Sequence, residues 1–345
     1  MKLRILEKYE LFQCIADKCP STCCSGWSIE IDDEAIEKYK SMSLEDVDYS
    51  EQCFKNKQNG DCYFLNENKL CDLYLKHGEG IFCRTCDMYP RHIEEFPDVR
   101  EYSLSISCPE VARMYLDPDI NVTNIYEQSN TEVDTEEYDE FDFETYDKLV
   151  ECRDVLFEIA LSDASLRNKI YNILSITADL QECIDIGSYD EISYDITQNT
   201  LEIDDILVNS LFDIFLELEP LNGKFREKVN EYRLSINKID LNKVINNFDT
   251  SHDNIEEILS RILHYFIYTY FCGAIYDEYI YGMAAVSVFS VVMLHVFMAL
   301  EEETKENVLT AEEMAEIVYM YSRELEHSTE NMIKLEQMLE DNRLI

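Results

Sequence analysis

Basic residues are scarce in this sequence of 345 residues. It contains 72 aspartates and glutamates but only 29 lysines and arginines, which gives a formal net charge of −43. Nucleic-acid binding depends on basic side chains that neutralise phosphates, so this composition excludes a nucleic-acid partner. The acidity either attracts a basic protein partner or only keeps the protein soluble.

Glycine-rich nucleotide-binding motifs are also missing. The nearest approach is Gly78-Glu79-Gly80, which lacks a third glycine and a convincing strand before it. A dinucleotide-binding turn needs G-x-G-x-x-G between a strand and a helix. The sequence therefore argues against a doubly wound nucleotide-binding domain.

The N-terminus lacks the features of a secretory leader. Residues 1–10 contain no apolar run and no small-residue cleavage site, whereas a leader requires both. We therefore expect a cytoplasmic protein. In that reducing compartment, cysteines do not normally form structural disulfides.

Proline is rare in the second half of the chain, where Pro220 is the only one beyond residue 119. Proline interrupts helices, so its absence permits long ones. The apolar periodicity predicts helices at 148–162, 164–186, 201–218, 223–236, 254–276, 279–300 and 310–341. Thr310 and Glu313 have the spacing of a capping box at the start of the last helix.

Residues 279–300 carry no formally charged side chain and are long enough to cross a bilayer. Their flanks, Asp277-Glu278 and Glu301-Glu302-Glu303, lack the lysine and arginine bias that sets membrane topology. We therefore expect a central core helix packed against 254–276 rather than a membrane span.

Cysteine, by contrast, is abundant, and ten of the 13 cysteines precede residue 109. Thiolates are preferred ligands of zinc, copper(I) and iron–sulfur clusters, and they often occur in short-range pairs. The main candidate ligands are Cys19, Cys23, Cys62, Cys71, Cys83 and Cys86, followed by Cys14, Cys24 and Cys108. These exceed the four ligands of one closed site, so a second metal is an open alternative. The isolated Cys152, Cys183 and Cys272, and also Cys53, are typical of small buried apolar residues.

The predicted organisation is mainly α. We expect an irregular cysteine-rich metal-binding domain with short strands at 1–120, an acidic connector at 121–147 and a helical domain at 148–345. Residues 127–144 hold nine acids and no base, and their mutual repulsion disfavours a compact structure. The alternation from Gly26 to Ile31 predicts a short strand that leaves the metal loop.

The residues between the cysteines carry a more specific pattern. It comprises Cys14-x4-Cys19-x3-Cys23-Cys24-Ser25-Gly26-Trp27, Cys62-Tyr63-Phe64-Leu65, Leu70-Cys71-Asp72-Leu73, Cys83-x2-Cys86-Asp87-Met88-Tyr89-Pro90-Arg91 and Cys108-Pro109-Glu110. Together these resemble the flagellin lysine N-methylase family, densely over residues 11–116 and weakly from Tyr265 to Asp277. A shorter outline, from Cys62-x-Phe64-Leu65 through Cys71 to Cys83-Arg84, is similar to a broader group of zinc- or iron-chelating domains.

The resemblance implies an enzyme that transfers methyl groups from S-adenosylmethionine to surface lysines of flagellin, with an iron–sulfur cluster, expected to be 4Fe–4S, at the cysteines. Zinc is the alternative metal. The common radical spacing, Cys-x3-Cys-x2-Cys, is missing, so polar and radical transfer both stay open. Two other classes of protein remain: a zinc or iron module or chaperone without methyl transfer, and an iron–sulfur redox protein.

Methyl transfer to lysine requires a neutral amine, although the reference pKa of lysine is about 10.4. The candidate catalytic residues are Tyr89 and Arg91, with Asp87 and Glu110 as weaker candidates for proton removal. The candidate cofactor-binding residues are Trp27, whose ring could stack on adenine, and Arg91, which could pair with the cofactor carboxylate. The alternatives are core packing for Trp27 and an ordinary salt bridge for Arg91.

Overall fold

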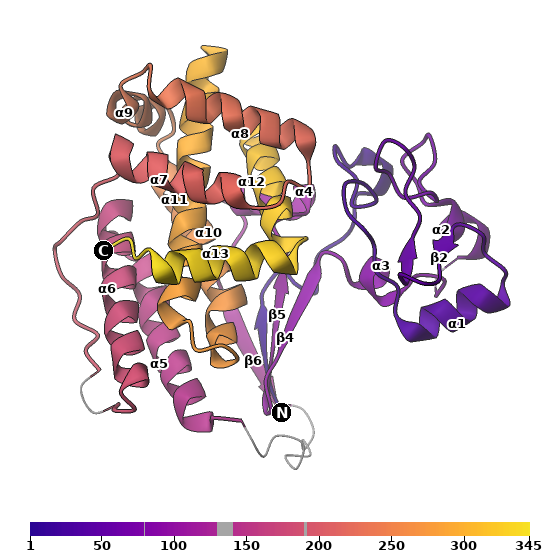
Figure 1. Ribbon diagram of the computed structural model, residues 1–345, viewed down its shortest axis with the longest axis horizontal. Coiled ribbons are helices and arrows are strands. Elements are labelled where there is room, and N and C mark those ends of the chain that lie inside the picture. The colour runs from indigo at the N-terminus through magenta and orange to yellow at the C-terminus, as the bar shows by residue number, and fades with distance from the viewer. Residues whose placement is uncertain (79, 130–140, 190–191) are drawn as a thin grey trace.

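The computed structural model describes residues 1–78, 80–129, 141–189 and 192–345. The predicted fold class is confirmed: a small cysteine-rich lobe with short strands stands to one side of a larger helical body (Figure 1). Glu79 of the G-x-G and residues 130–140 of the predicted acidic connector lie outside the described residues.

The cysteine-rich lobe has little regular structure. Its elements are η1 (Ala16–Lys18), α1 (Asp33–Ser41), β2 (Val47–Asp48), β3 (Cys53–Phe54), α2 (Asp72–His77) and α3 (Arg84–Met88). Tyr39 is fully buried in the small core of the lobe, where its hydroxyl donates to the Ile81 carbonyl at 2.7 Å. The predicted strand at 26–31 is wrong. Only isolated bridges form there, from Ser25 to Asp61 and from Glu30 to Cys53, because β3 is too short to extend a ladder.

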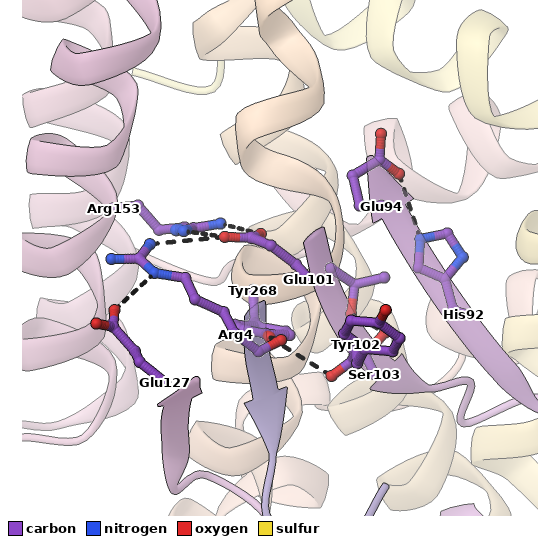
Figure 2. Close-up of polar contacts among 10 residues, drawn as sticks. Arg4, His92, Glu94, Glu101, Tyr102, Ser103, Glu127, Arg153 and Tyr268 are labelled. Atoms are coloured by element: carbon purple, nitrogen blue, oxygen red, sulfur yellow. Dashed lines mark hydrogen bonds and ion pairs between the residues drawn. The ribbon is translucent and has the colours of Figure 1, made fainter. Parts of the chain in front are cut away.

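The structure also contains a four-stranded sheet, whereas the sequence predicted only short strands. Its strands are β1 (Lys2–Leu6), β4 (Arg91–Glu95), β5 (Val99–Leu104) and β6 (Ile125–Ser129), in the order β4-β5-β1-β6. The pair β1 and β5 is parallel, and the other pairs are antiparallel. Tyr268 of α10 (Ile255–Tyr270) donates its hydroxyl to the Arg4 carbonyl at 2.9 Å, so the sheet is fastened to the helical body (Figure 2).

A buried ion network reinforces this attachment. Arg153 of α5 (Phe143–Ala160) and Glu101 of β5 are 0% and 2% exposed, and two hydrogen bonds of 2.5 and 2.6 Å join them (Figure 2). Arg4 of β1 lies 3.5 Å from the same carboxylate and also bonds to Glu127 of β6. Both buried charges therefore have partners, as burial in a low-dielectric core requires.

The helical body surrounds the long helix α11. Its other elements are α4 (Pro109–Leu116), α6 (Leu166–Asp185), α7 (Asp205–Glu217), α8 (Gly223–Ile236), α9 (Leu241–Ser251), η3 (Phe271–Ile275), α12 (Ala311–Glu326) and α13 (Thr329–Asp341). Helix α11 (Ile280–Lys305) packs against α6, α9, α10 and α13, which confirms the predicted core helix. Among the described residues, 255–275 and α11 are each long and apolar enough to cross a membrane, yet 83% and 94% of their most apolar windows are buried within the protein.

Two helix predictions need correction. The single helix expected at 310–341 is two helices, because Ser328 accepts a hydrogen bond from the Asn331 amide and caps a new helix, α13. Helix α9 was missed, since its asparagine-rich sequence has low intrinsic helix propensity and its apolar face decides the outcome. The capping box of Thr310 and Glu313 is confirmed.

Candidate cysteine-lined site

A cavity of about 790 Å³ opens between the cysteine-rich lobe and the start of α4. Eight of the nine predicted ligand cysteines line it: Cys14, Cys19, Cys23, Cys24, Cys62, Cys71, Cys86 and Cys108. The ninth, Cys83, is fully buried next to the cavity, with its sulfur 3.6 Å from the Glu30 carbonyl. The fold therefore brings thiols from distant parts of the sequence to one place.

The thiols of Cys23 and Cys24 form a hydrogen-bonded pair. The hydrogen bond from the Cys23 thiol, helped by Thr22, lowers the pKa of Cys24 to about 7, and the same bond raises the pKa of Cys23. One sulfur of the pair is thus close to ionisation at neutral pH. A thiol must lose its proton before it binds a metal.

A second pair lies at the start of α3. Cys83 is the N-cap residue of this helix, and Cys86 lies in its first turn. The hydrogen bond from the Cys86 thiol lowers the pKa of Cys83 and raises that of Cys86. The amides of a helix N-terminus favour negative charge at this position.

Four further thiols of the cavity are held in the neutral form by burial. Burial raises the pKa of Cys62 to about 12 and that of Cys108 to about 11, and it also raises the pKa of Cys19 and Cys71. A bound cation reverses this effect, because a coordinated thiol loses its proton outright.

The set of donors fits a metal that prefers sulfur. In the described parts of the chain, no three cysteine, histidine, aspartate or glutamate side chains are grouped closely enough to hold one ion. The thiols are instead distributed around a shared cavity. Cys152, Cys183 and Cys272 are buried elsewhere, as predicted, whereas Cys53 is only partly buried.

Arg91 lines the same cavity and offers a free positive charge. Its guanidinium lies 5.7 and 5.6 Å from the ring centres of Tyr9 and Phe12, and it donates to the Phe12 carbonyl at 3.4 Å. No described carboxylate forms an ion pair with it, so the ordinary salt bridge considered for this residue is not formed among these residues. An anionic group in the cavity could therefore pair with Arg91.

Trp27 and Tyr89 form the wall of the cavity that faces the helical body. The Trp27 indole donates to the Cys23 carbonyl at 2.7 Å and stacks on His327 with ring centres 4.4 Å apart. One face of Trp27 is thus covered, which supports a packing role for that face. Burial raises the pKa of Tyr89 well above its usual value, so its hydroxyl stays protonated.

The weaker sequence candidates have different environments. Asp87 lines the cavity, but Glu110 forms an ion pair with Arg113 at 2.8 Å. His92, which lies on β4 and is not part of this cavity lining, has its Nε2 3.4 Å from the carboxylate of Glu94 on the same strand (Figure 2).

Several residues of this region were missed by sequence reasoning. Arg323, Glu326 and His327, at the end of α12, contact the cysteine-rich segment through Ser21, Ser105 and Ser107. The contact from Arg323 to Ser21 joins residues separated by 302 positions. No local signal marks these residues, because their significance depends on how the two lobes pack.

The fold and the cavity define a class of protein in which a cysteine-rich lobe, of the kind that binds metals, is joined to a helical domain. Residues 13–107 match the family described as "Putative zinc- or iron-chelating domain". Residues 153–345 match the family described as the FliB lysine N-methylase C-terminal domain. This second match covers more than half of the chain, which therefore belongs to the FliB lysine N-methylase C-terminal domain family.

Curated relatives come from Salmonella. The chain is 29% identical over 124 residues to the Flagellar biosynthetic protein FliU of Salmonella muenchen. This alignment covers 31% of the present chain and 73% of that protein. The chain has the same identity over 124 residues to the Lysine-N-methylases of Salmonella typhimurium and Salmonella choleraesuis, with 31% of each chain covered. The match thus spans less than a third of the two methylases. No solved structure matches the chain.

Proposed function

We propose that this protein is a lysine N-methylase that transfers methyl groups from S-adenosylmethionine to surface lysines of flagellin. The observation that carries the proposal is the cavity, in which thiols, a free arginine and two aromatic walls meet in a member of the FliB lysine N-methylase family. The match to proteins named Lysine-N-methylase supports the reaction. The match to a protein named for flagellar biosynthesis supports the flagellar target.

The residues of the cavity suit a zwitterionic cofactor. S-adenosylmethionine would supply an activated methyl group on a positively charged sulfur. Arg91 would pair with its carboxylate, and the aromatic faces of Trp27 and Tyr89 would accommodate its adenine or its cation. The polar contacts would fix its orientation, which is a large part of what an enzyme contributes to a bimolecular reaction.

We propose an iron–sulfur cluster of the 4Fe–4S type on the cavity cysteines. It would supply a rigid centre that orders the irregular loops of the lobe. The first ligands would come from the two hydrogen-bonded thiol pairs, Cys23 with Cys24 and Cys83 with Cys86. A 4Fe–4S cluster and a closed zinc site each take four thiolates, so the number of thiols does not separate them, and the size of the cavity is what favours a cluster over one zinc ion.

Flagellin suits the electrostatics of the chain. A protein with a net charge of −43 attracts lysine-bearing surfaces and speeds encounter with them. Recognition of a protein surface also requires an accessible apolar area. Tyr74 at the rim of the cavity and the neighbouring Leu75 are 37% and 57% exposed and could provide it.

The test is anaerobic purification, analysis of iron, sulfide and zinc, and incubation of flagellin with S-adenosylmethionine. We expect bound iron and sulfide, and flagellin peptides heavier by one or more methyl groups in mass spectra. Unmodified flagellin in the presence of a fully loaded metal site would reject the methylase. Methylated flagellin with zinc in place of iron and sulfide would reject the cluster alone.

A metal-binding module without methyl transfer is the second candidate, because the cysteine-rich lobe matches a chelating family by itself. Calorimetric titration with S-adenosylmethionine separates the two functions. Binding that weakens in Arg91→Met but persists in the matched surface variant Arg100→Met would support the methylase. Reversible metal exchange without cofactor binding would support the module.

A further inference from the structure

A chain of hydroxyl groups leads from the cavity wall into the interface between the two lobes. The Tyr89 hydroxyl lies 3.0 Å from Ser107 Oγ, and Ser107 Oγ lies 2.6 Å from Ser105 Oγ. Ser105 in turn donates to Glu326 Oε2. Every link is a hydrogen bond, and Tyr89 itself lines the cavity. The chain therefore connects a residue that lines the cavity to one carboxylate.

Glu326 is the last residue of α12, and its carboxylate is surrounded by hydroxyls. Tyr265 donates to Oε2 at 2.9 Å, and Ser322 donates to Oε1 at 2.7 Å. No described lysine or arginine forms an ion pair with this carboxylate. Burial raises the pKa of Glu326, although the hydroxyl donors partly oppose this shift. A buried carboxylate without a lysine or arginine partner is a good place to receive a proton.

His327 cannot serve instead, although its Nε2 lies 3.1 Å from Ser107 Oγ. Burial and the nearby Arg323 lower the pKa of His327 to about 3, so the ring stays neutral. The direction of this contact depends on the tautomer of the ring, and the relay requires the tautomer that donates through Nε2, which leaves the Ser107 proton free to point toward Ser105. His327 thus orients the chain without taking up its proton.

Because methyl transfer requires a neutral lysine, we propose, on the basis of the proposed function, that Tyr89, Ser107, Ser105 and Glu326 form a proton relay that deprotonates the substrate lysine. The N–H bond of the ammonium breaks as Tyr89 Oη accepts its proton. Tyr89 passes its own proton to Ser107, Ser107 passes one to Ser105, and Ser105 passes one to Glu326, where a new O–H bond forms. The lysine nitrogen retains the electron pair that attacks the methyl group.

This assigns different roles to the two ends of the chain. Tyr89 meets the substrate and is the catalytic residue, whereas Glu326 acts through three hydroxyls and is a positioning and proton-holding residue. The titratable and charged groups around Glu326 are Tyr265 and Tyr270 of α10, Tyr115 of α4, His92 and Glu94 of β4, and Tyr321, Arg323 and His327 at α12. The two tyrosines of α10 add donors to the carboxylate but have no role in the transfer.

The first test compares Glu326→Gln with Glu324→Gln in the full-length, metal-loaded protein. Glu324 is a matched control, because it is a buried acid of the same helix that bonds to the Leu221 and Asn222 amides instead. We expect kcat of Glu326→Gln to fall by about 100-fold near neutral pH, the usual size of a general-base effect. The loss should shrink as the pH approaches the lysine pKa of about 10.4, where free amine is abundant. Glu324→Gln should keep the wild-type pH profile.

The second test does not depend on methyl transfer. Infrared titration of the same protein detects the carbonyl stretch of a protonated carboxyl group. We expect a band that Glu326→Gln abolishes, that Ser105→Ala and Tyr89→Phe shift, and that Glu324→Gln leaves in place. A carbonyl band whose position is the same in Ser105→Ala and Tyr89→Phe as in the wild type would overturn the relay. An active Glu326→Gln enzyme with an unchanged pH profile would also overturn it. If the carbonyl band behaved as expected in these variants but the protein did not methylate flagellin, only the proposed function would be rejected.

Discussion

The indole of Trp27 stacks on the imidazole of His327, with ring centres 4.4 Å apart and an angle of 29° between the planes. This contact joins the cysteine loop to the end of α12. Arg323 reinforces it, because its guanidinium donates to Ser21 Oγ at 2.8 Å, to the Ser21 carbonyl at 3.0 Å and to the Ser107 carbonyl at 3.0 Å. One wall of the cavity is thus held from the opposite end of the chain.

Replacement of Arg323 tests this attachment. Arg323→Ala removes three hydrogen bonds with a charged donor, so we expect a loss of about 2 kcal/mol in the free energy of unfolding. Amide hydrogen exchange should become faster in residues 19–27. Lys148→Ala, which removes an exposed ion pair with Glu151, is the control and should change stability by less than about 0.5 kcal/mol. Unchanged exchange in residues 19–27 of Arg323→Ala would contradict the prediction.

The buried pair of Arg153 and Glu101 should be essential for stability. Arg153→Met leaves the Glu101 carboxylate buried with only a 3.5 Å contact to Arg4, and we expect a loss of about 3–5 kcal/mol in chemical unfolding. The double variant Arg153→Met/Glu101→Met should recover part of this loss, since it removes the uncompensated charge. A double variant less stable than Arg153→Met would show that the pair does not act as a unit.

Metal content should follow the two thiol pairs. Cys86→Ser and Cys24→Ser are each expected to lower the bound iron in anaerobically purified protein, because serine is a poor ligand for iron or zinc. Cys152→Ser is the matched control, since Cys152 is fully buried in the helical body. Full metal content in both cavity variants would show that other thiols hold the metal. Chelation of the metal should also increase proteolysis of the lobe while α11 stays protected.

Glu336 of α13 should make the stability depend on pH. Burial, with Asp277 and Glu340 nearby, raises its pKa from 4.5 to about 8. The folded state then binds this proton more tightly than the unfolded state, so stability falls as the pH rises from 4.5 through 8. Glu336→Gln should therefore raise the free energy of unfolding at high pH by on the order of 5 kcal/mol. The substitution should have little effect on stability near pH 4.5. If chemical unfolding showed an equal gain in stability at pH 4.5 and above pH 8, titration of Glu336 would not be the cause.

Much of the helical body could be predicted because its signals are local. The apolar run at 279–300 became α11, and Thr310 with Glu313 formed the expected capping box. The break at Ser328 was missed because the apolar periodicity continues across it, and only the hydrogen bond to the Asn331 amide reveals a second helix. The parallel pairing of β1 with β5 was also missed, since it joins residues about a hundred positions apart.

The sequence by itself determined which thiols were available to the site, because the cysteines and the residues between them are properties of composition and spacing. It also determined that the chain would be mainly helical. Only the tertiary structure decided which residues complete the cavity. Trp27 meets His327, and Ser105 meets Glu326, because the cysteine-rich lobe packs on the end of α12. Such contacts depend on the summed packing of two lobes, which no short sequence pattern encodes.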